Sequence, residues 1–557
     1  MSPSAAPDAP KPFAEALAPR QRWFLLGSLM LTLFIGALDQ TVVSTALPKI
    51  VADLEGFSLI SWLFTSYLLT STVIVPLIGK LGDLYGRRLF LVGGVLIFIV
   101  ASGACGAAPT MGSLIAFRAV QGLGGGIIFA SVFATLGDAF SPMERGKYVG
   151  LFTGTFSLAS LLGPTLGGLL TDGYGWRMIF YINIPIGLIA MPAIWFNLPA
   201  RTAQRKVKLD FLGAALLAAA TVALLLALVW GGAKFAWGSF EIVGLFGASA
   251  LGVALFILQE WKHPEPILPL ALFKNRIFLL SNLVVFTFGM GVFGSFQYLG
   301  TFVQVALGAS ATTSGIISTP QSAATLVSSI IGGQIISRFG RYKWQTVFGT
   351  FLIALAMFLL RTLDVDTPKW HISAFVVILG LGFGLVLPTM SLIVLNAVSP
   401  QFIGVATSSS QFFRQIGSVL GVAIFGAVLA NSYSDEFATR FTEADRALVG
   451  PAIVTQLEDP TIRLNERQFK LLEQTVTALP GGSDVLVRAK AAQGSSIASA
   501  TRLIYTGAFI ACILSIVFAF AIKDIPLHRS KAAGPGAKAP APAPSAAAEA
   551  SPGGGSA

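Results

Sequence analysis

The chain alternates long apolar runs with short polar loops. A transmembrane α-helix needs about 20 mostly apolar residues, because each residue adds about 1.5 Å across a hydrocarbon core of about 30 Å. Runs of this length recur along most of the sequence, and we interpret each as a membrane-spanning helix. Fourteen spans are predicted, at residues 22–46, 58–79, 88–108, 112–135, 146–171, 177–198, 210–230, 240–259, 277–303, 313–336, 344–362, 371–397, 404–430 and 500–522.

Residues 431–499 break this pattern. They hold nine acidic and seven basic residues, and their apolar positions recur at helical spacing, as in Phe437, Phe441 and Leu448. We predict a small helical hairpin outside the membrane, and an irregular loop is the alternative.

A ten-residue motif occurs twice. The first copy runs from Gly79 to Arg88 and the second from Gly333 to Tyr342, with the glycines aligned and Arg87 matching Arg341. Both copies follow a predicted span on the same side, so an even number of spans separates them. The chain therefore divides into six spans, two inserted spans and six more. Two six-span halves favour alternating access around a central cavity.

Composition supports the same class of protein. Apolar residues make up 54% of the chain, charged residues 11%, and the mean hydropathy is +0.76, whereas soluble domains hold about 25% charged residues. We predict an all-α membrane protein with two six-helix bundles, two inserted helices and a central cavity. The expected segments are 1–21, a disordered cytoplasmic N-terminus; 22–198, the N-terminal bundle; 199–276, a linker with the inserted helices; 277–522, the C-terminal bundle with the extracytoplasmic hairpin; and 523–557, a disordered cytoplasmic tail.

The basic residues orient the chain. Its net charge is +11, and the Lys and Arg residues gather in short loops on alternate sides of the spans. With both termini in the cytoplasm, 22 of them lie in inner segments and five in short outer loops, as the positive-inside rule requires. We therefore predict cytoplasmic termini and no nucleic-acid partner. The first apolar run is longer than the apolar core of a cleaved signal peptide, which has about 7–15 residues, so we predict that this run is a membrane span and not a signal peptide.

Charged residues stand inside apolar runs, among them Asp39, Arg118 and Arg414, and the first two are candidates for proton coupling. Asp39 is the one carboxylate clearly within such a run, and a charge in hydrocarbon is costly unless it is protonated, paired or hydrated. Arg118, in the fourth span, needs an anion, backbone carbonyls or water for the same reason. We predict that both couple proton movement to transport. The alternatives are a packing acid bonded to Thr41 or Ser44, and a structural arginine bonded to carbonyls.

Three further groups are candidates for the transport cycle. Charges in the turn after the second span would latch one conformation, or else only orient the chain. The fifth span is rich in glycine and proline, which favours a pliable interface helix. Aromatic and polar side chains in other spans would line a cavity, or simply pack; aromatic walls with one acid favour lipophilic cations. The latch candidates are Gly79, Asp83, Gly86, Arg87 and Arg88, the interface-helix candidates are Gly154, Gly163, Pro164, Gly167 and Gly168, and the cavity candidates are Trp62, Tyr67, Gln121, Phe293, Gln297, Tyr298, Gln321, Asn396, Gln411, Phe412 and Arg414.

Four motifs together resemble one known family, the 14-span drug:proton antiporters (EmrB/QacA-like) of the major facilitator superfamily. Residues 38–48 are similar to its first-helix motif, and 79–88 match the superfamily's loop signature. Residues 118–126 resemble the fourth-helix motif associated with proton transfer, and 154–168 resemble the antiporter signature of the fifth helix. The resemblance covers about residues 20–525.

The resemblance implies the major facilitator fold, export and proton exchange. Asp39 would then be a proton or substrate carboxylate, and Arg118 its coupling partner. The chain departs from some relatives because its C-terminal half lacks additional cavity carboxylates, and Ser337 stands where the first repeat has Asp83. Fewer acids favour fewer protons per cycle, or a neutral or anionic substrate.

We therefore predict a proton-coupled exporter of amphipathic, drug-like compounds in the cytoplasmic (inner) membrane. The alternatives are a dedicated exporter of a metabolite, siderophore or lipid, with an envelope adaptor as partner, and a transport-incompetent sensor or scaffold. The third is disfavoured because Asp39 and Arg118 are both present. No nucleotide-binding loop or metal-ligand cluster occurs in the sequence, so we expect no enzyme activity, cofactor or metal. The expected partners are small molecules, protons and lipid, and we expect a monomer.

Overall fold

The apolar runs form helices because a helix satisfies its own backbone hydrogen bonds where water is absent. A computed structural model describes residues 13–54, 59–199, 209–232, 234–459, 462–464 and 466–524. The ordered elements in these ranges are almost entirely helical. The remaining residues, which include most of both predicted tails, lie outside the described structure.

The first six crossings come from the N-terminal part of the chain. Each is one long helix except the sixth, in which a single short turn precedes the main helix. Their bounds are α1 (Pro19–Leu54), α2 (Ile60–Tyr85), α3 (Arg87–Gly106), α4 (Met111–Ala139), α5 (Pro142–Gly173), α6 (Met178–Tyr181) and α7 (Asn183–Asn197).

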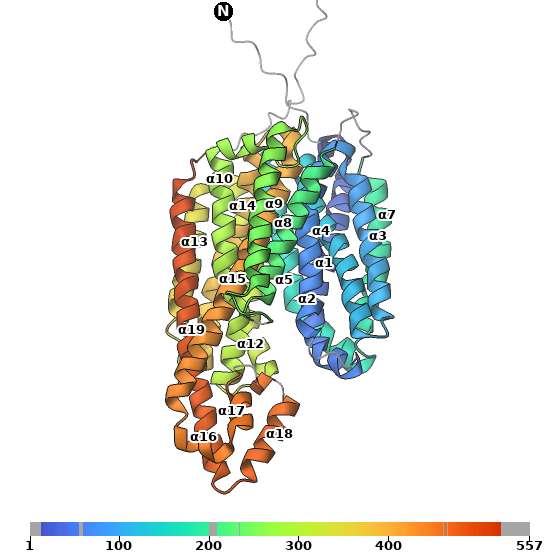
Figure 1. Ribbon diagram of the computed structural model, residues 1–557. Helices are drawn as coiled ribbons and strands as arrows, with labels where there is room; N and C mark the ends of the chain where they lie inside the picture. The colour runs from blue at the N-terminus through green and yellow to red at the C-terminus, as the bar shows by residue number, and fades with distance from the viewer. Residues whose placement is uncertain are drawn as a thin grey trace, which may run out of the picture.

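The inserted pair is α8 (Phe211–Trp230) and α9 (Phe240–Lys262). These helices stand between the two halves in Figure 1. Leu225 and Leu228 of α8 are buried against Val419 of the C-terminal half, with Leu69 of α2 packed alongside. The inserted helices therefore contact both halves rather than serving only as a tether.

The last six crossings begin with a helix that π-helical segments interrupt at Gly289–Phe293 and Phe302–Ala306. The helices are α10 (Arg276–Phe288), α11 (Gly294–Thr301), α12 (Ala311–Phe339), α13 (Lys343–Leu360), α14 (Lys369–Ala397), α15 (Ile403–Arg440) and α19 (Gly482–Ala521).

Thirteen helical segments in the described chain are long and apolar enough to cross a membrane. The fourteenth predicted crossing, 313–336, is α12, which spans 29 residues but carries many serines and threonines. Its polar side chains are tolerated because α5 and α14 pack along it. The fold is thus the predicted one, with two inserted helices between two groups of six.

Residues 431–499 form a helical extension. The ends of α15 and α19 continue into it without a break, and α16 (Glu443–Val449), α17 (Pro451–Leu457) and α18 (Glu466–Thr477) connect them. Its core is aromatic: the rings of Tyr433, Phe437 and Phe441 are buried and stack at 5.6 and 5.2 Å. Figure 1 shows the extension projecting from the end of the molecule opposite to the start of α1.

One ion pair holds α16 of the extension against α19. Arg488 donates to Asp445 Oδ1 through Nη2 at 2.6 Å and Nε at 3.1 Å, and the Thr442 hydroxyl donates to Oδ2 at 2.9 Å. The bonds from Arg488 lower the pKa of the Asp445 carboxyl below its ordinary value. A lowered pKa stabilises the fold above the unfolded-state value of about 3.9 and loses that effect as the pH falls through the folded value.

We expect the Asp445→Ala substitution to loosen the extension only locally. Because over half of the Arg488 side chain is exposed (54%), amide exchange in α16 should rise only about two- to five-fold at pH 7, as for other exposed ion pairs. Hydrogen exchange with mass spectrometry would measure it. In the wild type this contact should persist at pH 5 and weaken only below the ordinary aspartate range, and equal exchange in both proteins at pH 7 would contradict the assignment.

The two halves meet at the face that carries the start of α1 and the end of α19, here called the termini face. There, Gly333 and Gly150 approach so closely that a Cβ on Gly333 would lie 2.6 Å from the Gly146 carbonyl oxygen. Arg145 also donates to the Asn396 amide oxygen at 3.2 Å. Away from this face the halves diverge (Figure 1). The structure is therefore a conformation closed at the termini face.

Candidate functional site

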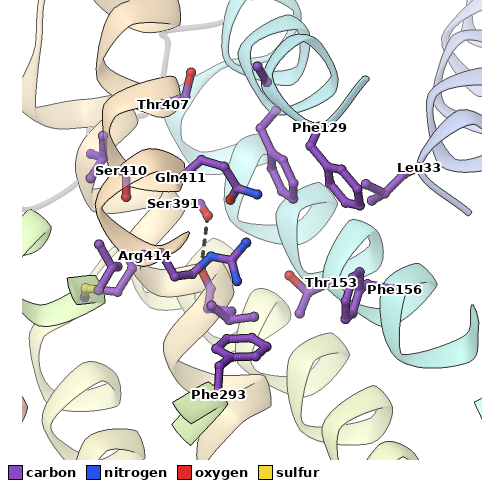
Figure 2. A pocket seen from close by; sticks show the side chains of 16 residues that line it. Leu33, Phe129, Thr153, Phe156, Phe293, Ser391, Thr407, Ser410, Gln411 and Arg414 are labelled. Carbon is purple, nitrogen blue, oxygen red and sulfur yellow. Dashed lines mark hydrogen bonds between the residues drawn. The ribbon is translucent and has the colours of Figure 1, made fainter. Parts of the chain in front are cut away.

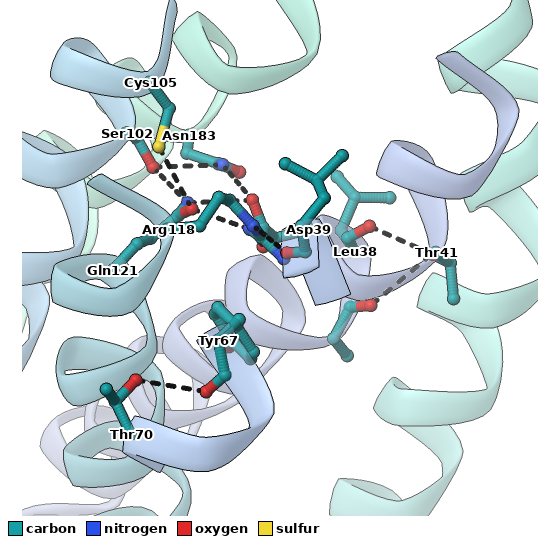
Figure 3. A network of polar contacts seen from close by, with 12 residues as sticks. Leu38, Asp39, Thr41, Tyr67, Thr70, Ser102, Cys105, Arg118, Gln121 and Asn183 are labelled. Carbon is teal, nitrogen blue, oxygen red and sulfur yellow. Dashed lines mark hydrogen bonds and ion pairs between the residues drawn. The ribbon is translucent and has the colours of Figure 1, made fainter. Parts of the chain in front are cut away.

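The Asp39 carboxylate lies at the centre of a polar network inside the N-terminal half (Figure 3). Arg118 Nη1 donates to its Oδ2 at 2.6 Å, and the Gln121 amide donates to its Oδ1 at 2.8 Å. Asn183 Nδ2 donates to the same Oδ1 at 3.1 Å. The Asp39 and Arg118 side chains are 0% and 1% exposed. The structure thus brings together the two charges that the sequence places in different spans.

Neighbouring groups fix the orientation of this network. Gln121 lies one turn after Arg118 on α4, so both side chains share one face; its amide oxygen accepts from Arg118 at 2.7 Å and its nitrogen donates to Ser102 at 2.7 Å. The ring of Tyr67 lies 4.4 Å from the Arg118 guanidinium carbon. We call Asp39, Ser102, Arg118, Gln121 and Asn183 the Asp39 network.

The geometry of this network matches an ionised carboxylate. Both oxygens of Asp39 accept hydrogen bonds from donors that have no acidic proton to exchange. A proton on Asp39 would remove the charge that pairs with Arg118 and would compete with these donors. The Asp39 carboxylate therefore joins α1 to α4 and α7 through these hydrogen bonds.

Residues 79–88, here called the latch segment, join the two halves at the termini face. The sequence predicted a turn after the second span, but the segment is the end of α2, Gly86 and the start of α3, because α2 continues to Tyr85. Asp83 accepts the backbone N–H groups of Gly404 and Val405, both at 2.9 Å, at the first turn of α15. Negative charge is favoured there because the helix dipole and free N–H groups point toward it. Arg87 pairs with Asp83 and with Asp138, the latter at 3.1 Å.

The other latch candidates shape the same turn. Gly86 has φ of 92°, a conformation that side chains disfavour, between the end of α2 and the start of α3. A Cβ on Gly79 would lie 2.6 Å from the Gly404 carbonyl oxygen. Arg88 points elsewhere, with its guanidinium 3.9 Å from the ring centroid of Trp195. The predicted latch is therefore a contact between α2 and α15 in which Arg88 has a separate role.

We expect the Asp83→Asn substitution to slow transport by about 10-fold, because breaking a buried ion pair is costly. The amide would keep the size of the side chain but would turn one donor toward the two N–H groups of α15. Initial rates of substrate efflux from proteoliposomes would measure the change. Asp172→Asn is the matched control, since that carboxylate is 77% exposed at its pair with Lys49. Equal rates for the two variants would contradict a latch at Asp83.

Helix α5 lies between the halves, as expected of an interface helix. A Cβ on Gly163 or Gly167 would meet the hydroxyl of Thr41 or Thr45 on α1, and one on Gly154 would lie 3.0 Å from Leu326 on α12. Pro164 stands within the helix, and Gly168 has no neighbour within 4 Å.

A central cavity lies between the halves (Figure 2). Its volume is about 80 Å³, which is room for a few water molecules and not for a drug-sized molecule. Four phenylalanines form much of its wall, and Arg414 and Gln411 extend into it from α15. Its lining residues are Leu33, Phe129, Ala130, Phe133, Thr153, Phe156, Val285, Phe293, Leu387, Met390, Ser391, Val394, Thr407, Ser410, Gln411 and Arg414.

Of the predicted cavity residues, Phe293, Gln411 and Arg414 line this cavity. Tyr67 and Gln121 belong to the surroundings of Asp39 instead. The remaining candidates lie in other environments: Trp62 contacts Trp230 of α8, Tyr298 donates to the Val422 carbonyl, Gln321 is buried on α12, Asn396 accepts from Arg145, and Phe412 packs with Val75 and Ile78. The side chain of Gln297 lies outside the described structure.

Sequence reasoning missed two members of the Asp39 network, Ser102 and Asn183. Each is a polar residue with apolar neighbours in a predicted span, but neither carries the charge that singled out Asp39. It also missed the cavity phenylalanines Phe129, Phe133 and Phe156. These three are indistinguishable in sequence from the many other phenylalanines of the spans.

Comparisons with known proteins agree with this architecture. The family model described as Major Facilitator Superfamily matches residues 29–422. Multidrug transporter protein MdtP of Bacillus subtilis is 44% identical over 409 residues, covering 73% of this chain and 75% of that protein. Multidrug resistance protein 3 of the same organism is 35% identical over 437 residues, covering 78% and 85%.

A solved structure supports the fold independently. The human organic anion transporter MFSD10 (TETRAN) superposes with a TM-score of 0.57 over 89% of this chain and 100% of its own, at 14% identity. The family match, the two bacterial relatives and the arrangement of two six-helix halves lead to one assignment. This chain is a member of the major facilitator superfamily.

Proposed function

We propose that this chain is a proton-coupled exporter of amphipathic, drug-like compounds that works by alternating access. The observation that carries the proposal is the buried Asp39–Arg118 pair inside the N-terminal half. A separate cavity, lined by residues of both halves, supports it. Relatives named as multidrug transporters support the cargo class. One proton moving down a potential of 100 mV releases about 2.3 kcal/mol, which is enough to drive accumulation of a small molecule.

The distribution of basic residues supports an orientation. With both termini in the cytoplasm, the closed termini face is the cytoplasmic one, and this conformation shuts the cavity from that side. The helical extension then lies outside the cytoplasmic (inner) membrane. Within this assignment, residues 22–198 and 277–522 are the two moving halves, and 199–276 carry the inserted helices.

Coupling would proceed through the Asp39 network. In the conformation closed at the termini face, Asp39 is paired with Arg118. A proton that enters from the outer side neutralises Asp39 and frees Arg118 from its counter-charge, which weakens the contacts of α1 with α4 and α7. Release of that proton on the inner side restores the pair and resets the cycle.

A dedicated exporter of one metabolite is the second candidate, and the ordered extension is the observation that favours it. Extensions of this kind suit a partner in the envelope, to which cargo is passed. An exporter that releases its cargo only in the presence of an adaptor protein would support this reading, whereas efflux by the isolated chain supports the first.

Reconstitution of the full chain in liposomes tests the proposed function. A pH gradient is imposed across the membrane, and the lumenal pH is followed while compounds from a panel of amphipathic cations, neutral molecules and anions are added. Discharge of the gradient on addition of a compound, in proteoliposomes and not in protein-free liposomes, supports proton antiport. A gradient that no member of the panel discharges would overturn the proposal.

A further inference from the structure

A positive charge stands in the central cavity without a counter-charge. Arg414 is the only formally charged residue among the described residues that line it, and Glu and Asp are absent from that lining. The guanidinium carbon lies 5.1 Å from the ring centroid of Phe293. Within the described chain we find no carboxylate that forms an ion pair with Arg414.

The other intramembrane arginine, Arg118, shows how this protein partners a buried guanidinium from within the fold. Arg118 is 1% exposed, and Asp39, Gln121 and the Leu63 carbonyl oxygen surround its guanidinium. A guanidinium at membrane depth needs an anion, carbonyl oxygens or water. Because the protein gives Arg118 these partners and gives Arg414 a cavity, the missing partner of Arg414 must come from outside the fold.

The backbone presents Phe293 and Arg414 to one another. Phe293 is the last residue of the π-helical segment Gly289–Phe293, and such segments are frequent at functional sites because they re-aim the side chains that follow. At the start of this segment a Cβ on Gly289 would meet the Arg414 carbonyl oxygen, so α15 packs directly on it. The π-helical segment thus holds the Phe293 ring beside the Arg414 guanidinium.

The rest of the lining has the chemistry to hold an amphipathic molecule once the halves separate enough to admit one, because the cavity of about 80 Å³ is too small in this conformation. Phe129, Phe133 and Phe156 supply apolar walls from the N-terminal half, and Phe129 and Phe156 lie opposite to Arg414 on α15 (Figure 2). Hydroxyl groups of Thr153 and Ser391 add neutral hydrogen-bonding positions. A cation would meet repulsion from Arg414 and no acid, whereas a carboxylate would gain a charge-assisted, bidentate pair.

We propose that Arg414 is the specificity-determining residue of the cavity and selects amphipathic organic anions, with an oxyanion on its guanidinium and an aromatic or aliphatic body against the phenylalanines. The proposal rests on the proposed exporter function and names its substrate class. It also fixes the electrical character of transport: export of a monoanion in exchange for one proton moves two charges per cycle, whereas a neutral substrate moves one and a monocation none.

Three probes with one body and different charges test this selection: 1-pyrenebutyrate, 1-pyrenebutanol and 1-pyrenebutylamine. Binding to the full chain in lipid nanodiscs is followed by pyrene fluorescence. We expect the wild type to bind the butyrate most tightly. Arg414→Gln should weaken butyrate binding by about 10-fold or more, the loss expected for one charge-assisted hydrogen bond, and should leave the alcohol unchanged. Arg414→Lys should keep part of the affinity.

Arg502→Gln is the matched control, since Arg502 is exposed on α19 with a distant pair to Asp364 at 3.7 Å. Tighter binding of the amine than of the butyrate by the wild type would overturn the proposal. So would unchanged butyrate affinity in Arg414→Gln. If Arg414→Gln fails to fold, the butyrate-to-alcohol affinity ratio of Arg414→Lys decides, and a ratio equal to that of the wild type contradicts bidentate pairing.

Transport separates this inference from the proposed function. In proteoliposomes the wild type should move butyrate and protons together, with a rate that rises more steeply with membrane potential than that for the alcohol. Arg414-dependent butyrate binding without any proton movement would refute the antiporter and leave the anion site standing. Proton-coupled transport of the amine alone would support the antiporter and refute the anion site.

Discussion

We expect substrate-dependent proton influx to fall to the level of protein-free liposomes when Asp39 is replaced by asparagine. The amide has the size of the carboxylate but neither takes up nor releases a proton, and it offers Arg118 no charge. Because the network is buried, no water can substitute for the lost charge at low cost. We therefore expect complete loss of coupling rather than a modest reduction in rate.

Lumenal pH in the proteoliposome assay measures this effect, and exchange of labelled for unlabelled substrate without a gradient shows whether binding survives. Asp39→Glu should retain partial coupling because it still titrates. Asp364→Asn, an exposed carboxylate with 58% side-chain exposure, should behave as the wild type. Equal acidification by the wild type and Asp39→Asn would remove Asp39 from the coupling mechanism.

We expect the Gly333→Val substitution to stop the transport cycle because the larger side chain prevents the two halves from closing at the termini face. A Cβ at this position would lie 2.6 Å from the Gly146 carbonyl oxygen and 3.1 Å from the Gly150 Cα. These neighbours are backbone atoms of α5, so they cannot turn aside as a side chain would. Overpacking of this kind costs about 1–3 kcal/mol or more, which is enough to make the closed conformation the minor one.

Two spin labels would measure the opening, at Lys147 of α5 and Arg341 after α12, which are both exposed on the termini face. They can be attached through introduced cysteines, because the native Cys105 and Cys512 are buried. We expect a longer distance in Gly333→Val and loss of transport. Gly315→Val on the same helix has no neighbour within 4 Å and should leave both unchanged; the same shift in both variants would contradict the steric explanation.

The architecture could be predicted from the sequence because membrane-spanning helices are recognised by their length and apolar composition. The polar helix α12 was predicted as the apolar run 313–336, and the repeated motif at 333–342 then placed it as the counterpart of α2. Asp39 and Arg118 were recognised because a charged side chain in hydrocarbon is costly unless it is paired or hydrated. Their contact at 2.6 Å depends on how α1 and α4 pack together, and a single sequence does not reveal that packing.

The cavity was harder to predict. Tyr67 and Gln121 have the chemistry expected of a substrate site, yet they serve the Asp39 network because their helix faces turn into the N-terminal half. The π-helical segments at Gly289–Phe293 and Phe302–Ala306 shift the register of the following residues. A regular helical wheel therefore assigns the wrong face to residues that follow Phe293, and Tyr298 is one of them.

Because α15 and α19 continue unbroken from the membrane-spanning region into the extension, the extension moves when these helices tilt. They span 38 and 40 residues, or about 57 and 60 Å at 1.5 Å per residue, and are therefore much longer than a hydrocarbon core of about 30 Å. The end of α15 and the first part of α19 lie in the extension. A small tilt of these helices inside the membrane becomes a larger displacement at α16–α18. A change in the cavity that tilts α15 or α19 would therefore also move α16–α18. An antibody fragment that held α16–α18 in place would then arrest transport from outside the bilayer.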